Sequence, residues 1–258
     1  MILQVWFVRH GQSESNLVGA IGRNNSSPLT SKGEEQAKKL GKYFKKHNID
    51  FDYVFASVAV RAYDTARLAC EAAGITTPIT QREEIVEIHR GDCEGKTVQE
   101  VFVGKALERY RADPGNYRCN GGESELEVEE RMVAFVNSEV LSLLEKKVSK
   151  EEQSSIRQDS EEQRKLEQYD DENEEDKGHI PVDPYDLQHK PSKKDPVIRV
   201  GIFSHGCAIR CFLRSVLGSD PSVLRFSLGN TAVSELHIDS QGGQWKVVSI
   251  NRTVHLHD

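Results

Sequence analysis

The stretch ILQVWFVRHG at residues 2–11 decides the fold of this chain, because it joins an apolar segment to two basic side chains and a glycine. Residues 2–8 include β-branched and aromatic side chains, which are typical of a strand buried on both faces of a sheet. Gly11 directly follows His10 and marks a turn. We therefore predict a buried strand over residues 2–8 that leads into a loop at His10.

The same alternation of apolar strand and helix continues along the chain. Ser31 and Glu34 are predicted to form a capping box at the start of one helix, and Gly74 and Gly218 are predicted to end two others. The predicted helices cover residues 34–46, 61–73, 97–110, 126–144 and 207–217, and the further predicted strands cover residues 52–57, 198–203, 233–238 and 245–250. This pattern predicts an α/β fold of three layers, helix–sheet–helix, with a mostly parallel sheet.

Length and composition predict a single domain over residues 1–258. With 37% hydrophobic residues, the chain is long enough to bury one sizeable core. No apolar stretch approaches the roughly 20 residues that a membrane-spanning helix requires. Residues 1–10 lack the basic flank and the small-residue cleavage site of a signal peptide. We therefore expect a cytoplasmic protein that does not bind a membrane.

The cysteines are predicted to be reduced. Their number is odd and no CxxC pair is present, so the sequence indicates neither a disulfide framework nor a zinc site. Consistent with this, we expect neither a metal nor a cofactor. The five cysteines are Cys70, Cys93, Cys119, Cys207 and Cys211.

The net charge of −7 is concentrated in one segment of the chain. Thirteen acidic and six basic residues lie between Glu145 and Asp176, whereas the remaining 28 acidic and 28 basic residues balance. No basic stripe is present, so nucleic acid is not an expected partner. Residues 146–195 are too polar to build a core, and we interpret them as a charged, mobile insertion. The alternative is an acidic docking segment for a protein partner.

Chemically competent side chains follow three of the predicted strands. Arg9 and His10 follow the first strand, Arg61 begins the helix after the second, and His205 follows the strand at residues 198–203. The carboxyl ends of parallel strands meet at one edge of a sheet, where binding sites form. Two arginines and two histidines at such an edge suit a phosphate dianion, since a guanidinium donates paired hydrogen bonds to phosphate oxygens.

With these residues in this order, the chain resembles the histidine phosphatase superfamily, also called phosphoglycerate mutase-like. The resemblance covers nearly the whole chain except residues 146–195. The matching motifs are residues 9–16 (RHGQSESN), 28–33 (PLTSKG), Ser57, 61–66 (RAYDTA), Glu87, Gly91, 94–95 (EG), 121–124 (GGES), 204–206 (SHG) and 230–231 (NT).

The resemblance implies a catalytic role for two residues. His10 would attack phosphorus and form a phosphohistidine, which requires a neutral ring with one nitrogen held as a donor to a backbone carbonyl. Glu87 would protonate the leaving oxygen and later deprotonate the attacking water. The alternative interpretation of Glu87 is a surface carboxylate.

The resemblance also implies the residues that hold the phosphoryl oxygens: Arg9, Asn16, Arg61 and His205. Ser13, Arg23 and Gly206 are further candidates for this pocket. Arg23 would reach a second substrate phosphate or, alternatively, would be an exposed loop arginine. The thiol of Cys207 is expected to pack, and its backbone N–H to face the phosphate.

Several activities share this type of site. Mutases usually carry a Trp two residues after the motif glutamate, where this chain has Asn16, so a phosphatase acting on a small phosphate ester is preferred. Residues 94–96 (EGK) and 121–124 (GGES) are similar to the TIGAR-type fructose-2,6-bisphosphatases, which suggests fructose-2,6-bisphosphate or another sugar phosphate. The alternatives are a phosphoglycerate mutase-type activity and a non-catalytic regulatory or adaptor protein.

Overall fold

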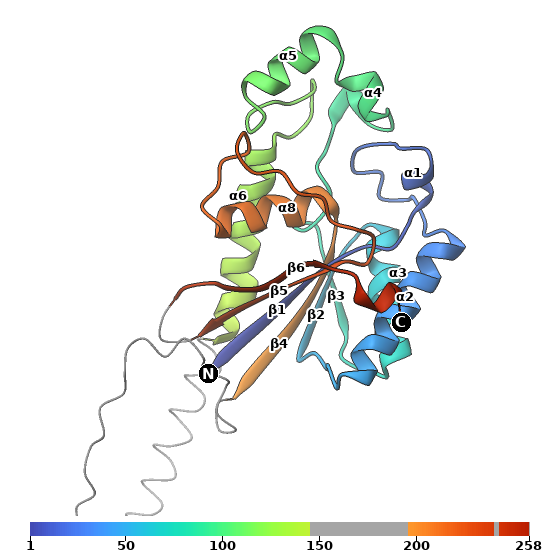
Figure 1. The fold of residues 1–258 in the computed structure, drawn as a ribbon. Helices are drawn as coiled ribbons and strands as arrows, with labels where there is room; N and C mark the ends of the chain where they lie inside the picture. Colours follow the sequence, from blue (N-terminus) through green and yellow to red (C-terminus); the bar gives the residue numbers. More distant parts are fainter. Residues whose placement is uncertain (145–195, 240–242, 258) are drawn as a thin grey trace, which may run out of the picture.

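A six-stranded sheet with strand order β3-β2-β4-β1-β5-β6 forms the centre of the fold. We describe it from a computed structural model, for residues 1–144, 196–239 and 243–257 (Figure 1). The predicted insertion at residues 146–195 lies outside the described residues. In the sheet, β1 pairs in parallel with β4 and antiparallel with β5. Of these six strands, β5 alone runs opposite to the others, so the prediction of a mostly parallel sheet is confirmed.

The elements alternate along the chain much as predicted. The strands are β1 (Ile2–Arg9), β2 (Tyr53–Ser57), β3 (Ile79–Arg82), β4 (Val197–Ser204), β5 (Val233–Asp239) and β6 (Lys246–Arg252). The helices are α1 (Glu14–Leu17), α2 (Ser31–Lys46), α3 (Val60–Ala73), α4 (Val98–Val101), α5 (Gly104–Ala112), α6 (Glu125–Phe135) and α8 (Gly206–Val216). Short 3₁₀ turns occupy Gly91–Cys93 and Val254–Leu256, and a π-helical segment, Val136–Leu141, continues α6.

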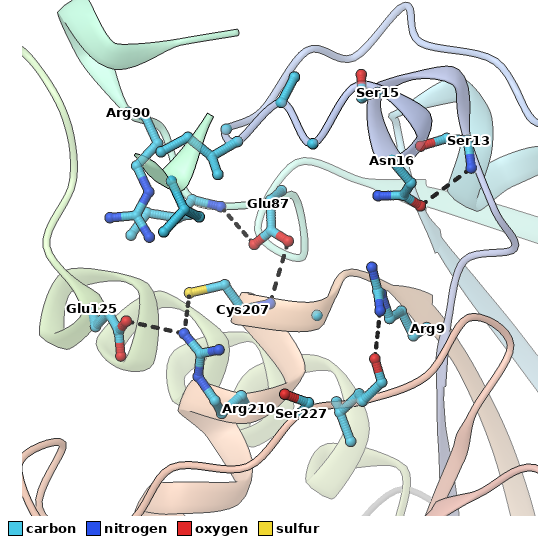
Figure 2. A pocket seen from close by; sticks show the side chains of 18 of the residues that line it. Arg9, Ser13, Ser15, Asn16, Glu87, Arg90, Glu125, Cys207, Arg210 and Ser227 are labelled. Atoms are coloured by element: carbon cyan, nitrogen blue, oxygen red, sulfur yellow. Dashed lines mark hydrogen bonds and ion pairs between the residues drawn. The ribbon is translucent and has the colours of Figure 1, made fainter. Parts of the chain in front are cut away.

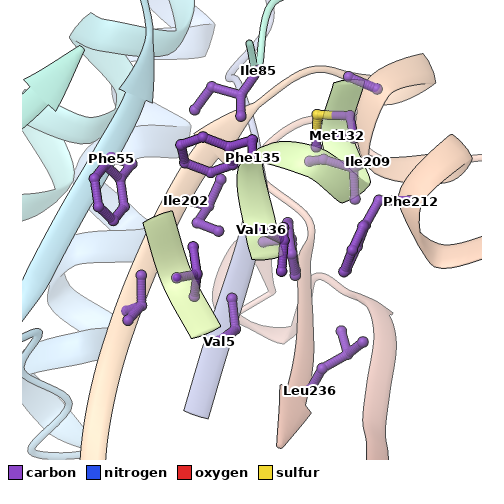
Figure 3. Close-up of a cluster of buried hydrophobic side chains, with 14 of the residues drawn as sticks. Val5, Phe55, Ile85, Met132, Phe135, Val136, Ile202, Ile209, Phe212 and Leu236 are labelled. Atoms are coloured by element: carbon purple, nitrogen blue, oxygen red, sulfur yellow. The ribbon is translucent and has the colours of Figure 1, made fainter. Parts of the chain in front are cut away.

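Helices cover the sheet on both faces, because alternate side chains of each strand point to opposite sides. Val5 of β1 lies in the larger core with Phe135 of α6 and Phe212 of α8, as Figure 3 shows. Phe7 belongs to the same core. Trp6 lies in a second core that is built from α2 and α3. Burial of each such side chain stabilises the fold by roughly 1.5–3 kcal/mol. The predicted three-layer α/β architecture is therefore confirmed.

Three local predictions were wrong in detail. The cap of α2 is Thr30, whose hydroxyl accepts the Gly33 N–H, and not Ser31. The helix predicted at residues 97–110 is divided into α4 and α5, because Val103 has an extended backbone. Strand β3 was not predicted, since its four residues (ITQR) are short and partly polar at the edge of the sheet.

The prediction that all cysteines are reduced is also wrong, because Cys93 and Cys119 form a disulfide. The bond links the loop after Glu87 to the segment that follows α5. This outer region has only a small core of its own, centred on Val101 and Tyr117. A cross-link between residues 26 apart compensates for a small core by restricting the unfolded chain, an effect of typically about 2–4 kcal/mol.

The remaining cysteines, Cys70, Cys207 and Cys211, are free and buried. The disulfide removes the support that reduced cysteines gave to the predicted cytoplasmic location. None of the helices in the described part of the chain is long and apolar enough to cross a membrane.

Candidate active site

The loop that carries His10 lies directly against the first turn of α2. A Cβ atom at Gly33 would lie 2.0 Å from the carbonyl oxygen of Gln12, and one at Gly11 would lie 2.6 Å from the carbonyl oxygen of Gly33. Only glycine at both positions permits this approach. The backbone N–H of Gly11 also donates to the Thr65 hydroxyl on α3, at 3.0 Å. The loop is therefore fixed by two helices.

His10 is held as a neutral imidazole. It is 3% exposed, and its Nδ1 lies 2.7 Å from the Gly11 carbonyl oxygen, which can only accept a hydrogen bond. The proton is thus assigned to Nδ1, and Nε2 keeps its lone pair. Burial, together with the charges of Arg61 and Arg9, lowers the pKa of His10 well below its ordinary value of 6.5. The predicted tie between the ring and a backbone carbonyl is confirmed.

Arg61 faces the nucleophile from the start of α3. Its Nε donates to His10 Nε2 at 3.2 Å, and its terminal nitrogens donate to the carbonyl oxygens of Asn24 and Arg23. Thr65 stabilises this turn of α3, because its hydroxyl donates to the Arg61 carbonyl oxygen at 2.6 Å. The guanidinium is therefore aligned beside the nitrogen that would attack phosphorus.

Arg9 approaches the same cavity from the end of β1. One terminal nitrogen donates to the Leu228 carbonyl oxygen, and the buried Nε has no partner among the described residues (Figure 2). A Cβ at Gly206 would lie only 3.3 Å from this Nε. Glycine at position 206 therefore leaves room for the guanidinium beside the first turn of α8.

His205 lies behind His10 and is fully buried, with the two ring centroids 5.2 Å apart. The Ser57 hydroxyl, which accepts the Ala59 N–H, lies 2.8 Å from His205 Nε2 and can donate to it. Nδ1 then carries the proton, and it has no partner among the described residues. Burial, with the charge of Arg61, lowers the pKa of His205 well below 6.5. The ring therefore offers an N–H donor without a charge.

Asn16 and Ser13 line the cavity across from Arg9 (Figure 2). The Asn16 side-chain oxygen accepts from the Ser13 backbone N–H at 3.2 Å and from the Asn230 amide at 3.1 Å. The NH₂ group of Asn16 is therefore left as a donor. The buried Ser13 hydroxyl has no partner among the described residues. Asn230, to which the sequence analysis assigned no role, also donates to the His10 carbonyl oxygen.

Glu87 lines the cavity near the first turn of α8. Its carboxylate accepts the backbone N–H of Ile88 at 2.9 Å and that of Cys207 at 3.2 Å. The expectation that the Cys207 N–H faces the phosphate was therefore wrong, because it donates to Glu87. This contact joins the loop that carries Glu87 to the helix that follows His205. The interpretation of Glu87 as an isolated surface carboxylate does not fit this position.

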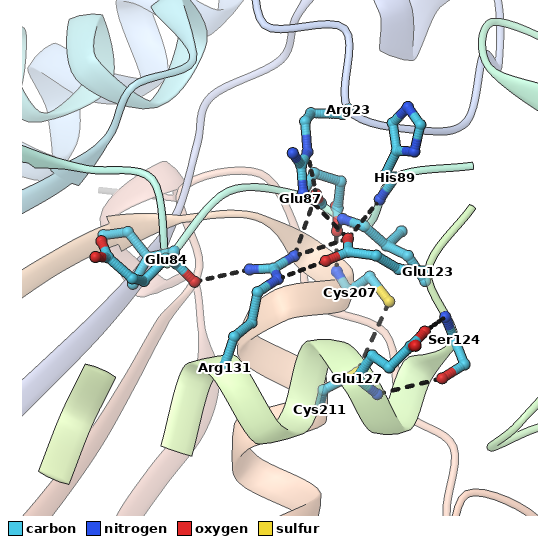
Figure 4. Close-up of polar contacts among 12 residues, drawn as sticks. Arg23, Glu84, Glu87, His89, Glu123, Ser124, Glu127, Arg131, Cys207 and Cys211 are labelled. Atoms are coloured by element: carbon cyan, nitrogen blue, oxygen red, sulfur yellow. Dashed lines mark hydrogen bonds and ion pairs between the residues drawn. The ribbon is translucent and has the colours of Figure 1, made fainter. Parts of the chain in front are cut away.

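Arg23 lies behind Glu87 and does not line the cavity. Its Nε donates to the Glu87 carbonyl oxygen at 3.2 Å, and its Nη2 pairs with Glu123 (Figure 4). Arg131 of α6 contacts the same two residues. Although burial raises the pKa of Glu123, the hydrogen bond from Arg131 and that from the His89 N–H hold it below its ordinary value of 4.5. This network fixes the backbone of Glu87.

The cavity has a volume of about 620 Å³ and extends well beyond the histidines. Its far wall contains arginines that the sequence analysis did not identify. The only available signals were that Arg90 lies three residues after Glu87 and that Arg210 lies in the first turns of the helix after His205. The wall comprises Arg90, Phe102, Leu107, Tyr110, Glu125, Arg210, Arg225 and Ser227.

A group of candidate metal ligands also borders this wall. Glu125, Cys207 and Cys211 place ligand atoms within 4.8 Å of one another. The Glu125 carboxylate, however, already pairs with Arg210 and Arg214. Two guanidinium groups at the carboxylate oppose a cation, so we interpret this cluster as a buried ion-pair network.

The two buried histidines predict how stability depends on pH. Since the pKa of each is lowered in the folded state, the unfolded chain binds more protons below about pH 6.5. We therefore expect the free energy of unfolding to be greatest above pH 6.5 and to decrease as the pH falls from there towards the folded-state pKa values. His205→Gln should reduce this dependence in urea unfolding at pH 7.5 and 5.5, whereas the exposed His47→Gln should not. Equal dependence in all three proteins would contradict the assignment of neutral rings.

Solved structures of other proteins share this fold. A solved mycobacterial glucosyl-3-phosphoglycerate phosphatase superposes with a TM-score of 0.66, at 20% identity and 97% coverage of this chain and 99% of that one. Phosphoserine phosphatase from Entamoeba histolytica superposes with the same score, at 21% identity and 98% and 99% coverage. At these identities the likeness shows the fold alone.

Two curated relatives share sequence with part of the chain. A 2,3-bisphosphoglycerate-dependent phosphoglycerate mutase of Bifidobacterium longum is 34% identical over 111 residues, which are 43% of this chain and 45% of the relative. An adenosylcobalamin/alpha-ribazole phosphatase of Escherichia coli is 34% identical over 110 residues, 43% of this chain and 52% of that protein. The chain therefore spans about half the length of the curated relatives that it matches.

The fold and the site define an α/β protein that gathers histidines, arginines and a carboxylate around a cavity at the strand ends. The sequence model of the histidine phosphatase superfamily (branch 1) matches residues 5–149 and 186–253, and the chain belongs to this family. The predicted family is thereby confirmed, and its members among the relatives are named as phosphatases and mutases.

Proposed function

We propose that this protein is a phosphatase that hydrolyses a small phosphorylated metabolite through a phosphohistidine on His10. The observation that carries the proposal is the state of His10, whose Nδ1 is tied to the Gly11 carbonyl while Nε2 faces Arg61. A buried imidazole whose unprotonated Nε2 accepts a hydrogen bond from a guanidinium is arranged to attack a phosphoryl group that displaces this contact.

The reaction proceeds in two displacements. Nε2 of His10 attacks phosphorus, the P–O bond to the alcohol breaks, and Glu87 gives a proton to the leaving oxygen. Water then attacks the phosphohistidine, Glu87 takes a proton from it, and the P–N bond breaks to release inorganic phosphate and neutral His10. Both displacements use the carboxyl group that the Cys207 N–H holds at the cavity wall.

Fixed donors stabilise the charge on the transferred phosphoryl oxygens. Arg9, Arg61 and Asn16 line the cavity, and the first two carry positive charge. The neutral His205 Nδ1–H, which has no partner among the described residues and belongs to the ring next to His10, is proposed as a further donor. Such preorganised donors stabilise a phosphoryl transition state. The two arginines supply the positive charge, so we propose that turnover requires no metal.

The substrate that we favour is fructose-2,6-bisphosphate or another sugar phosphate, on the TIGAR-like motifs. The second candidate is phosphoglycerate mutase activity, which the mutase among the partial relatives favours. A regulatory or adaptor protein on this fold would not be expected to keep His10, Arg61 and Glu87 in reacting order.

The proposal is tested by incubating the wild-type protein, with a chelator, with fructose-2,6-bisphosphate, phosphoglycerates and an aryl phosphate. Both phosphate release and isomer formation are followed. Phosphate release in the chelator supports the proposed metal-independent phosphatase, and the best ester identifies its substrate class. Isomer formation without phosphate release indicates the mutase. Absence of both would overturn the proposal and favour the adaptor.

Glu87→Gln is expected to lower kcat/KM for alkyl phosphates by about 10²-fold or more, because glutamine cannot give a proton to the leaving oxygen. An aryl phosphate has a better leaving group and should lose less activity in the same step. The matched control is Glu84→Gln, an exposed carboxylate of the same segment, which should keep wild-type rates. Equal losses for alkyl and aryl esters would argue against the acid role of Glu87.

A further inference from the structure

The far end of the cavity is lined by three arginines that the proposed chemistry does not use: Arg90, Arg210 and Arg225. A further pocket of about 290 Å³ adjoins it and shares Tyr110, Arg210 and Arg225 with the main cavity. The space around these arginines is therefore continuous with the space around His10. In Figure 2, Arg90 and Arg210 lie on one side of Glu87, and Asn16 and Arg9 lie on the other.

Arg90 is buried at this wall but its guanidinium is unpaired. Arg90 is 8% exposed, and its Nε has no hydrogen-bond partner among the described residues. Its backbone is nevertheless fixed, because the Arg90 N–H donates to the Glu94 carboxylate at 2.6 Å. An unpaired guanidinium in a buried position is costly unless an anion pairs with it.

Arg225 and Arg210 are oriented by contacts that leave most of their N–H groups free. The Arg225 guanidinium lies over the ring of Tyr110, 4.9 Å from the centroid, and no hydrogen bond holds it within the described part of the chain. The Arg210 Nη2 pairs with Glu125 at 3.0 Å and contacts the Cys207 sulfur. Its remaining nitrogens have no partner among the described residues.

Positive charge exceeds negative charge at this wall. Glu125 pairs with Arg210 and also with the buried Arg214, and Glu87 is the other carboxylate in the cavity lining. Burial and the charge of Glu125 raise the pKa of Tyr110. The charges of the three arginines each act in the opposite direction, which shows that all three lie near its hydroxyl group. A wall with uncompensated guanidinium groups attracts an anion from solution.

We propose that Arg90, Arg210 and Arg225 form a second anion-binding subsite, so that the substrate carries a second phosphate or a carboxylate remote from the phosphate that is cleaved. This inference rests on the proposed function. Phe102 and Tyr110, whose ring centroids are 4.6 Å apart, line the same wall and would contact the carbon skeleton between the two anionic groups. Arg23, which the sequence analysis considered as the contact for a second phosphate, pairs with Glu123 instead. The three arginines of the subsite are proposed to make this contact in its place.

The subsite is tested by calorimetric binding to the His10→Ala protein, so that turnover does not enter the measurement. Two matched pairs of ligands are used: glycerol 3-phosphate against 3-phosphoglycerate, and fructose 6-phosphate against fructose 1,6-bisphosphate. In at least one pair, we expect the ligand that carries the second anionic group to bind about tenfold tighter or more than its partner, since charge-assisted hydrogen bonds are strong. The pair with the larger ratio identifies the second anion as carboxylate or phosphate.

Variants in the same background assign the preference to the arginines. Arg90→Met and Arg225→Met should each reduce the ratio by about tenfold, and Arg90→Lys should keep part of it because the charge is retained. Arg111→Met is the matched control, since Arg111 is exposed on α5 beside Tyr110 and outside the cavity lining. Equal affinities within both pairs, no binding of any ligand, or a ratio unchanged by the arginine variants would overturn the subsite. Wild-type turnover of the esters, measured separately, decides the proposed function.

Discussion

His10→Ala is expected to abolish phosphate release, with kcat lowered by about 10⁴-fold or more for every ester that the wild-type protein hydrolyses. The reason is that alanine removes the atom that bonds to phosphorus, while Arg9, Arg61 and His205 still bind the phosphate. Water would then have to displace the alcohol directly. The measurement is phosphate release under saturating ester, with wild type and variant at equal concentration.

A second measurement separates loss of the nucleophile from loss of folding. The ester carries a labelled phosphoryl group, so that a phosphohistidine formed during turnover labels the protein. Because phosphohistidine is unstable in acid, the reaction is not quenched with acid, and the labelled protein is isolated in base. Wild type should carry label during turnover, and His10→Ala should not. His47→Ala, at the exposed residue that follows the last turn of α2, is the matched control and should keep both rate and label. Retention of a tenth of the rate by His10→Ala would place the nucleophile elsewhere.

The sequence was sufficient to predict the centre of the fold, and the reason is local. The apolar run of β1 is buried on both faces, so it has no amphipathic pattern that could be mistaken for a surface helix. The same holds for β4, which lies beside β1 in the sheet. Because both strands are parallel, the polar residues that follow them necessarily come together. The structure places the rings of His10 and His205 beside each other, with their centroids 5.2 Å apart, for this reason.

The far wall of the cavity could not be predicted in the same way. Arg90, Arg210 and Arg225 lie in three segments that meet only through tertiary packing, and no sequence spacing relates them. The disulfide between Cys93 and Cys119 was missed for a similar reason, since an odd cysteine count conceals a single pair. Residues that directly follow a strand are therefore visible in the sequence, whereas the arginines of this wall come together only through the packing of separate segments of the chain.

Glu125→Leu is expected to lower the free energy of unfolding by about 3–5 kcal/mol, because it leaves the buried Arg214 without its principal counter-ion. The Arg214 side chain is 1% exposed, and it pairs with Glu125, which is itself 5% exposed. Although burial raises the pKa of Glu125, Arg210 and Arg214 hold it below its ordinary value of 4.5. The ion pair therefore stabilises the fold above pH 4.5, and this contribution is lost as the pH falls through the lowered pKa.

Urea unfolding of a double variant distinguishes an unpaired charge from lost packing. Removing both partners in Glu125→Leu/Arg214→Met should recover much of the stability, because the Arg214 guanidinium is then no longer buried without the Glu125 carboxylate. Glu130→Leu, an exposed position of α6, should change stability by no more than about 0.5 kcal/mol. If the double variant were less stable than Glu125→Leu, the cost would lie in packing at this wall, and the ion pair would not be the reason that Glu125 is buried.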